Sequence, residues 1–256
     1  MKIIVSVKQV PARDSALRVN NDGKWLEQSD LTYEMNEPDA YALEEALQLR
    51  DKLGGEVIVL CAGPERALQT VREALAKGAD RAIHVQIEEQ GAPDALATAK
   101  LLAKAIQPEL PDLVLTGLQS DDLGYGQTGV ILAELLEFSH ATIVMEVEPE
   151  GSTIRVKREL EDGWFQNVFL PLPAVLTIQS GIKKLRYATL MGIKKAKTKD
   201  VKTVSASQFG VDLASGMIMQ RVYLPQRNKE TQIFSGDPRQ AAKQLVEKLK
   251  FEARVL

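Results

Sequence analysis

The chain has few of the side chains on which most catalytic centres depend. Its 256 residues include one cysteine, Cys61, and two histidines, His84 and His140. A single cysteine excludes an internal disulfide and any zinc site made of several cysteines. Neither a G-x-S-x-G motif nor a paired-histidine motif is present. The sequence therefore predicts no catalytic residues and no metal ligands.

Long apolar runs and a large net charge are also absent. No stretch reaches the roughly 20 apolar residues of a membrane span, and the apolar start of the chain is too short for a secretory signal. A net charge of -3 and a pI of about 5.6 disfavour general affinity for nucleic acid or an anionic membrane. We expect a protein that is not embedded in a membrane, in the bacterial cytoplasm or the mitochondrial matrix.

Short apolar runs alternate with helical patterns through roughly the first 140 residues. The runs at 2–7, 56–61, 81–85 and 112–117 are predicted as strands, and helices are predicted at 36–53, 65–77 and 93–106. Nearly continuous apolar strands are typical of a parallel sheet that is covered on both faces. The order predicts a doubly wound, Rossmann-like α/β fold, with Asn36 as the N-cap of its first helix.

The pattern changes after Ser139. The segments 141–148, 152–162 and 164–178 are predicted as antiparallel or edge strands, with turns at Gly151 and Gly163. From about Lys183 the chain has no regular apolar strands, and it ends in a predicted helix with Ala241, Leu245 and Leu249 on one face. We expect an α/β nucleotide-binding domain at 1–182, a basic segment at 183–202 and an extended arm with a helix at 203–256.

A glycine-rich loop after the fourth predicted strand is the candidate ligand site. In TGLQSDDLGYGQTGVILAELLE, 116–137, a strand ends at Gly117 and a helix begins near Gly126 or Gln127. Ligands of parallel α/β sheets bind beyond the carboxyl ends of strands, and helix N-termini attract phosphate. An ordinary strand–helix turn, with Asp121 and Asp122 as turn formers, is the alternative. The G-x-G-x-x-G and G-x-x-x-x-G-K-[ST] motifs are absent. A binding loop without catalytic groups favours a carrier or binding subunit over an enzyme.

Several stretches together resemble the beta subunit of electron transfer flavoprotein. They are VKQVP at 7–11, MNEPDAYALEEAL at 35–47, ALAKGADRAIHV at 74–85, QTG at 127–129, VKRELEDG at 156–163, LPAVLTI at 172–178 and LRYATLMGIKKAK at 185–197. The resemblance covers nearly the whole chain in order, which makes the set specific although each piece alone is weak.

This resemblance implies a heterodimer with an alpha subunit that carries the redox-active FAD. Electrons would pass from acyl-CoA and related dehydrogenases of fatty acid β-oxidation, through FAD, to a membrane-bound quinone reductase. The beta subunit would bind a structural AMP. The matching positions are Ser6, Asn36, Glu37, Pro38, Asp39, Ala62, Gly63, Gln119, Asp121, Asp122, Gly126, Gln127, Thr128 and Gly129.

The glycine loop also distinguishes two branches of the family. Electron-bifurcating relatives hold a second FAD in place of AMP and show a loop that resembles DGDTAQVGP. This chain has DDLGYGQTG at 121–129, which is closer to the AMP-binding form DDDCNQTG but differs from it. AMP is favoured, with a second FAD as the alternative. No basic side chain is expected at the pocket, which suits a monophosphate better than a triphosphate.

The basic segment LRYATLMGIKKAKTK, 185–199, resembles the family's recognition loop for partner dehydrogenases. The resemblance implies that Leu190 anchors in an apolar pocket of the partner, with Tyr187, Met191 and Ile193 around it, while the lysines speed encounter with acidic partners. The alternatives from the residues alone are a solvated loop with Leu190 packed inside, and a nucleic-acid patch. Glu159 is a candidate contact with the alpha subunit, as is the arm.

Overall fold

The computed structural model describes residues 1–88, 93–225 and 231–255. Within these residues, nine strands form one sheet in the order β11-β5-β4-β1-β6-β10-β7-β8-β9, and β2 and β3 form a small second sheet. The strands are β1 (Lys2–Ser6), β2 (Gln9–Pro11), β3 (Tyr33–Met35), β4 (Glu56–Gly63), β5 (Arg81–Gln86), β6 (Leu113–Gly117), β7 (Ser139–Glu150), β8 (Thr153–Glu159), β9 (Phe165–Pro171), β10 (Ala174–Ile178) and β11 (Val201–Ser205).

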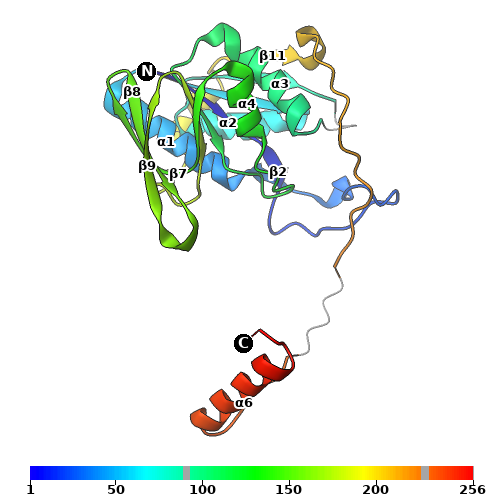
Figure 1. Ribbon diagram of the computed structural model, residues 1–256. Coiled ribbons are helices and arrows are strands. Elements are labelled where there is room, and N and C mark those ends of the chain that lie inside the picture. Colours follow the sequence, from blue (N-terminus) through cyan, green and yellow to red (C-terminus); the bar gives the residue numbers. More distant parts are fainter. Residues whose placement is uncertain (89–92, 226–230, 256) are drawn as a thin grey trace.

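Helices cover both faces of the sheet, as Figure 1 shows. The α-helices of the described residues are α1 (Glu37–Leu53), α2 (Leu68–Lys77), α3 (Ala95–Ile106), α4 (Thr128–Leu136), α5 (Leu190–Ala196) and α6 (Pro238–Phe251), of which α6 lies away from the sheet. Buried side chains of α1 and α2 pack on one face, and those of α3 and α4 pack on the other. The prediction of a doubly wound, mostly parallel sheet is confirmed.

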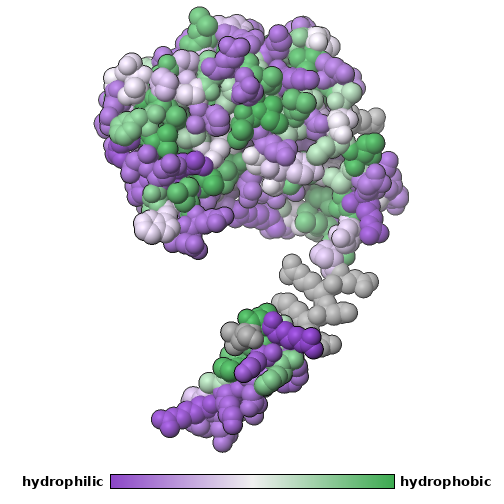
Figure 2. Space-filling model, viewed as in Figure 1, coloured by the Kyte–Doolittle hydropathy of each residue, from purple (hydrophilic) through white to green (hydrophobic). Residues whose placement is uncertain are grey.

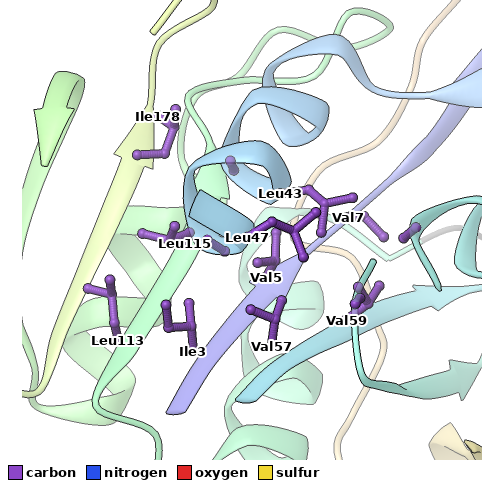
Figure 3. Packing of buried hydrophobic residues seen from close by; sticks show 14 of the residues in the cluster. Ile3, Val5, Val7, Leu43, Leu47, Val57, Val59, Leu113, Leu115 and Ile178 are labelled. Atoms are coloured by element: carbon purple, nitrogen blue, oxygen red, sulfur yellow. The ribbon is translucent and has the colours of Figure 1, made fainter. Parts of the chain in front are cut away.

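Burial on both faces of the sheet explains why the parallel strands could be predicted from the sequence. Ile3 and Val5 of β1 have no solvent-exposed surface, and Leu43 and Leu47 of α1 pack above them in the same cluster (Figure 3). Each such buried side chain contributes about 1.5–3 kcal/mol relative to an exposed one. Since Ile4 is buried against the opposite layer, every position of β1 in this stretch must be apolar.

The position of β1 creates the edge at which a ligand is expected. The chain proceeds from β1 to β4 and β5 on one side, then returns through α3 to β6 on the other side of β1. The strand order therefore reverses between β1 and β6, and in open α/β sheets such a reversal leaves a crevice at the carboxyl ends of the strands.

The prediction that 164–178 forms only antiparallel or edge strands is wrong for its second half. β10 lies inside the sheet, parallel to both β6 and β7, and all five of its residues are buried. Its run AVLTI lacks alternation because both faces are covered, which is the pattern of the other parallel strands. β7, β8 and β9 are joined antiparallel, as expected.

The prediction that no regular strand follows Lys183 is also wrong. β11 extends the sheet at its edge, parallel to β5, and pairs Val201 with Ala82. No residue of β11 is fully buried, so its apolar pattern is too weak to identify a strand. The antiparallel pair of β2 and β3 was likewise not predicted, because each strand has only three residues.

The arm was predicted at 203–256; in the structure 203–205 belong to β11 and Ala206–Phe209 form a short 3-10 helix, so the extended part begins after Phe209. It runs along the body in extended form, where the Val222 amide donates to the Gly23 carbonyl oxygen at 2.7 Å. Residues 226–230 and 256 of this arm lie outside the described residues. Among the described residues, no helix is both long enough and apolar enough to cross a membrane.

The predicted terminal helix is α6, which lies away from the sheet in Figure 1. None of its residues is buried, and Leu245 and Val246 are about half exposed. Figure 2 shows apolar and polar surface side by side on this helix. α6 is therefore amphipathic and has no partner for its apolar side chains in the described part of the chain.

Candidate functional site

The carboxyl ends of β1, β4 and β6 meet at one edge because the three strands are parallel neighbours. This edge brings together the predicted residues Ser6, Gly63 and Gln119, which are far apart in the sequence. Of the other predicted residues, Glu37, Ala62, Asp122, Gly126 and Thr128 are half-buried, while Pro38 and Gly129 are buried and Gln127 is exposed.

Asn36 connects the start of α1 to the loop at 118–127. Its side chain donates from Nδ2 to the Gln119 carbonyl oxygen at 3.0 Å and accepts from the Asp121 amide at 2.9 Å. The prediction that Asn36 is the N-cap residue of α1 is confirmed, but its side chain makes no capping bond there. Because Asn36 is only 1% exposed, both bonds are shielded from water and hold the loop firmly.

Asp39 joins the ends of the two strands between which the sheet order reverses. Its carboxylate accepts from the Lys8 amide at 2.7 Å and from the Gly117 amide at 2.9 Å. Burial raises the pKa of Asp39 to about 7, against the opposing effect of these N–H donors. A Cβ atom at Gly117 would lie 2.3 Å from Asp39 Oδ1, so only glycine allows this close approach.

Lys8 overturns the expectation that no basic side chain lies at the pocket. Its ammonium group donates to Asp122 Oδ1 at 2.7 Å and to Ser120 Oγ at 3.3 Å. Asp121 instead accepts from the Glu37 amide at 3.2 Å. The two neighbouring aspartates therefore have different partners and do not converge. No cluster of three or more potential metal ligands occurs in the part of the chain that the structure describes.

The start of α4 completes this edge. Gln127 is the N-cap residue and makes no side-chain capping bond, so the first backbone N–H groups of α4 have no side-chain acceptor from the cap. A Cβ atom at Gly129 would lie 2.6 Å from Thr177 Cγ2 and 2.7 Å from Thr116 Oγ1. α4 thus packs closely on β6 and β10, and the fold places a positive helix terminus at the strand ends.

Sequence reasoning missed a connection between His84 and the site. This residue has no exposed surface, and its Nε2 lies 3.0 Å from the carbonyl oxygen of Gly63, at the end of β4. Its Nδ1 has no hydrogen-bond partner among the described residues. Burial lowers the pKa of His84 and favours its neutral form. His84, on β5, thus contacts the end of β4 beside the candidate site, which its position in the sequence did not indicate.

The predicted partner-docking side chains gather around the start of α5, and we call Tyr187, Leu190, Met191 and Ile193 the apolar tip. Their exposed fractions are 89%, 83%, 62% and 45%. The sequence showed no helical period here, yet Leu190–Ala196 is helical and is capped by Thr189 Oγ1, which accepts from the Gly192 amide at 3.0 Å. The alternative that Leu190 packs inside is wrong, because this side chain lies in solvent.

The basic residues around the apolar tip divide into two groups. Arg186 pairs with Glu44 at 2.9 Å and with Asp51 at 3.1 Å, and Lys183 lies 3.7 Å from buried Glu45. Lys184, Lys194, Lys195 and Lys197 are exposed and form no ion pair within the described residues. Of these two groups, only the four lysines of the second carry positive charge that no neighbouring carboxylate of the described residues balances.

Glu159 lies at the end of β8, half-buried, and accepts a bond from Gln179 Nε2 at 3.4 Å. It does not contact the candidate nucleotide residues. A cavity of about 460 Å³ lies nearby, lined by residues that include Lys157, Phe165 and Lys183. None of the candidate nucleotide residues lines this cavity, so the strand-end edge and the cavity are separate features.

The chain is similar to proteins of known family over most of its length. The model of the electron transfer flavoprotein domain matches residues 24–209. Electron transfer flavoprotein subunit beta of Methylophilus methylotrophus is 38% identical over 95% of this chain and 96% of its own. The subunit of the same name from Bradyrhizobium diazoefficiens is 39% identical, with all of both chains covered. That of Homo sapiens is 36% identical over 100% of this chain and 99% of its own.

Proposed function

This chain belongs to the electron transfer flavoprotein family as a beta subunit, and on that premise we propose that it is an electron-carrier subunit rather than an enzyme. In this proposal it binds a structural AMP and pairs with an alpha subunit that carries the redox-active FAD. It docks acyl-CoA and related dehydrogenases through Leu190, and electrons continue through FAD to a quinone reductase.

The observation that carries the nucleotide proposal is the attachment of the loop at 118–127 to Asn36. This attachment holds the loop that leads from the end of β6 to the start of α4 beside the start of α1. Glycine at positions 117 and 129 permits the close approach of helix and strand that this arrangement needs. Backbone N–H groups of α4 and the Thr128 hydroxyl would hold the phosphate.

The charge near this loop supports a monophosphate. Among the described residues, the ammonium group that contacts the loop is that of Lys8, and it is already paired with Asp122, so little positive charge is left to balance a triphosphate. Arg13 pairs with Glu37 and lies 3.6 Å from Asp121 of the loop, so its charge is also balanced by carboxylates.

Two features support contact with an alpha subunit. The amphipathic helix α6 exposes Leu245, Val246 and Phe251, and these side chains have no cover within the described chain. The arm before it also exposes Ile218 and Leu224. Exposed apolar surface of this extent is typical of a protein interface. Glu159, at the end of β8, is the proposed polar contact.

Cofactor release from the purified heterodimer tests the nucleotide proposal. The chain is co-expressed with its alpha subunit, the complex is denatured, and released small molecules are identified and quantified by mass spectrometry. We expect one FAD and one AMP per heterodimer. Two FAD molecules would instead identify a bifurcating flavoprotein, and a stable colourless monomer without nucleotide would contradict the whole proposal.

A variant connects this result to the site. Asn36→Ala removes both bonds to the loop and should reduce the AMP content while FAD remains at one per heterodimer. Asn20→Ala is the matched control, because Asn20 also accepts a backbone N–H, from Trp25 at 3.2 Å, but in the segment between β2 and β3. Equal AMP content in Asn36→Ala and the wild type would contradict the assignment of the pocket.

A further inference from the structure

Burial of its own side chains does not explain why α5 is helical. It has seven residues, and Ala196 is its only buried side chain, while the apolar tip at its start remains in solvent. Isolated helices shorter than roughly 12–15 residues are marginal in water. The conformation of α5 must therefore come from contacts that do not use its large apolar side chains.

The first of these contacts is a close backbone approach to α2. A Cβ atom on Gly192 would lie 2.3 Å from the carbonyl oxygen of Ala76, near the end of α2. Ala196 follows Gly192 by four residues and is buried in the core cluster that also contains Ala76. Residues four apart lie on the same side of a helix, so this side of α5 faces α2 and the apolar side chains are left free.

The second contact is a reciprocal set of hydrogen bonds. A basic side chain of α2 binds carbonyl groups at the end of α5, and a basic side chain just after α5 binds carbonyl groups at the end of α2. Arg72 of α2 donates from Nη1 to the carbonyl oxygens of Ala196, at 2.7 Å, and Lys199, at 3.1 Å. In return, Lys199 donates from Nζ to the carbonyl oxygens of Leu75, at 3.0 Å, and Ala79. Each helix thus receives a positive charge at its C-terminus, where the carbonyl groups lack helical partners.

We propose that Arg72 and Gly192 are positioning residues of the docking surface, which hold α5 on α2 so that the apolar tip is presented in one orientation. This inference rests on the proposed docking function. A surface that is ordered before encounter loses less conformational entropy on binding. If α5 is released from α2, only the fraction of molecules with α5 in place can dock, and the apparent affinity falls by that fraction.

The test uses the heterodimer with its alpha subunit as electron acceptor for a purified acyl-CoA dehydrogenase. Arg72→Met removes the donors to α5, and Gly192→Ala forces the helices apart. If either change leaves α5 in place for about a fifth of the time, KM for the flavoprotein rises about fivefold while kcat is unchanged. Arg72→Lys should recover part of this loss, because one ammonium group can still donate to the end of α5.

A second measurement separates positioning from helix stability. Alanine is a better helix former than glycine, so Gly192→Ala should strengthen α5 itself and still raise KM. Trypsin should also cleave after Lys194 and Lys195 faster in Arg72→Met, because α5 is released from α2 there without any gain in its own helix propensity. A lower KM in Gly192→Ala than in the wild type would overturn the inference.

Two controls distinguish the possible failures. Arg81→Met removes ion pairs with Glu56 and Glu109 at the amino ends of β4 and β5, and it should lower stability without a change in KM. Leu190→Ala is measured in the same assay. If Leu190→Ala raises KM but Arg72→Met and Gly192→Ala do not, the positioning inference is wrong and docking stands. If Leu190→Ala has no effect either, the docking proposal fails and the inference with it.

Discussion

Replacement of Leu190 by alanine should separate docking from folding. Leu190 is 83% exposed, so its truncation removes almost no buried surface from the folded chain and should change the free energy of unfolding by less than about 0.5 kcal/mol. In a docked complex the same side chain would be fully buried, and burial of a leucine contributes about 1.5–3 kcal/mol. The affinity for a partner dehydrogenase should therefore fall about 10- to 150-fold.

The assay compares two variants of the heterodimer with the wild type. Leu110→Ala is the matched control, because Leu110 is 81% exposed and follows the 3-10 helix Gln107–Glu109, remote from α5. Affinity for the dehydrogenase is measured by surface plasmon resonance, and unfolding is measured with urea. FAD content should be equal in all three proteins. Unchanged affinity in Leu190→Ala, or an equal loss in Leu110→Ala, would refute the assignment of Leu190 as the anchor.

Two further predictions concern the strand-end site. Asp39 has a folded-state pKa of about 7 against an ordinary value of 3.8, so ionisation is disfavoured in the folded chain. The free energy of unfolding therefore falls as pH rises from about 4 to 7, by about 4 kcal/mol in total from this group. Above about pH 7 this contribution is at its lowest. Asp39→Asn should remove this pH dependence. Urea unfolding across that pH range should therefore show the variant gaining stability relative to the wild type as pH rises. A stability difference that stays constant with pH would contradict the prediction. Gly117→Ala should lower the free energy of unfolding by about 1–3 kcal/mol, because the added Cβ atom would meet Asp39. Gly216→Ala, whose Cβ atom would meet only Asp94 Oδ2 at 3.6 Å, should change it little, and equal effects of the two in urea unfolding would show that the contact at Gly117 is unimportant.

The sequence indicated the parallel strands well but could not assign the direction of one of them. β1 and β4 were recognisable because burial on both faces requires apolar residues at successive positions. β10 has the same composition, yet it follows three strands that are joined antiparallel, β7, β8 and β9, and was predicted as one of that kind. The direction of a strand depends on its neighbours in the sheet, and β6 lies more than 50 residues before β10.

Asn36 shows a similar limit within the site. Its residue type and its place before a helix predicted an N-cap, and local preference supported that role. The structure uses its side chain for Gln119 and Asp121, which lie 83 and 85 residues away. Lys8 was overlooked for the same reason, since its partners Ser120 and Asp122 belong to a loop that only the folded sheet brings near.

The sequence by itself determined the fold class and the family, because these follow from local apolar patterns and ordered motifs, and it predicted the segments at which a nucleotide and a partner would bind. Only the tertiary structure decided the orientation of the side chains. Leu190 could have packed inside or pointed outward, and the choice depends on the contact between Gly192 and Ala76, which lie 116 residues apart. Long-range contacts decide which apolar side chains are left in solvent, and no local pattern contains that information.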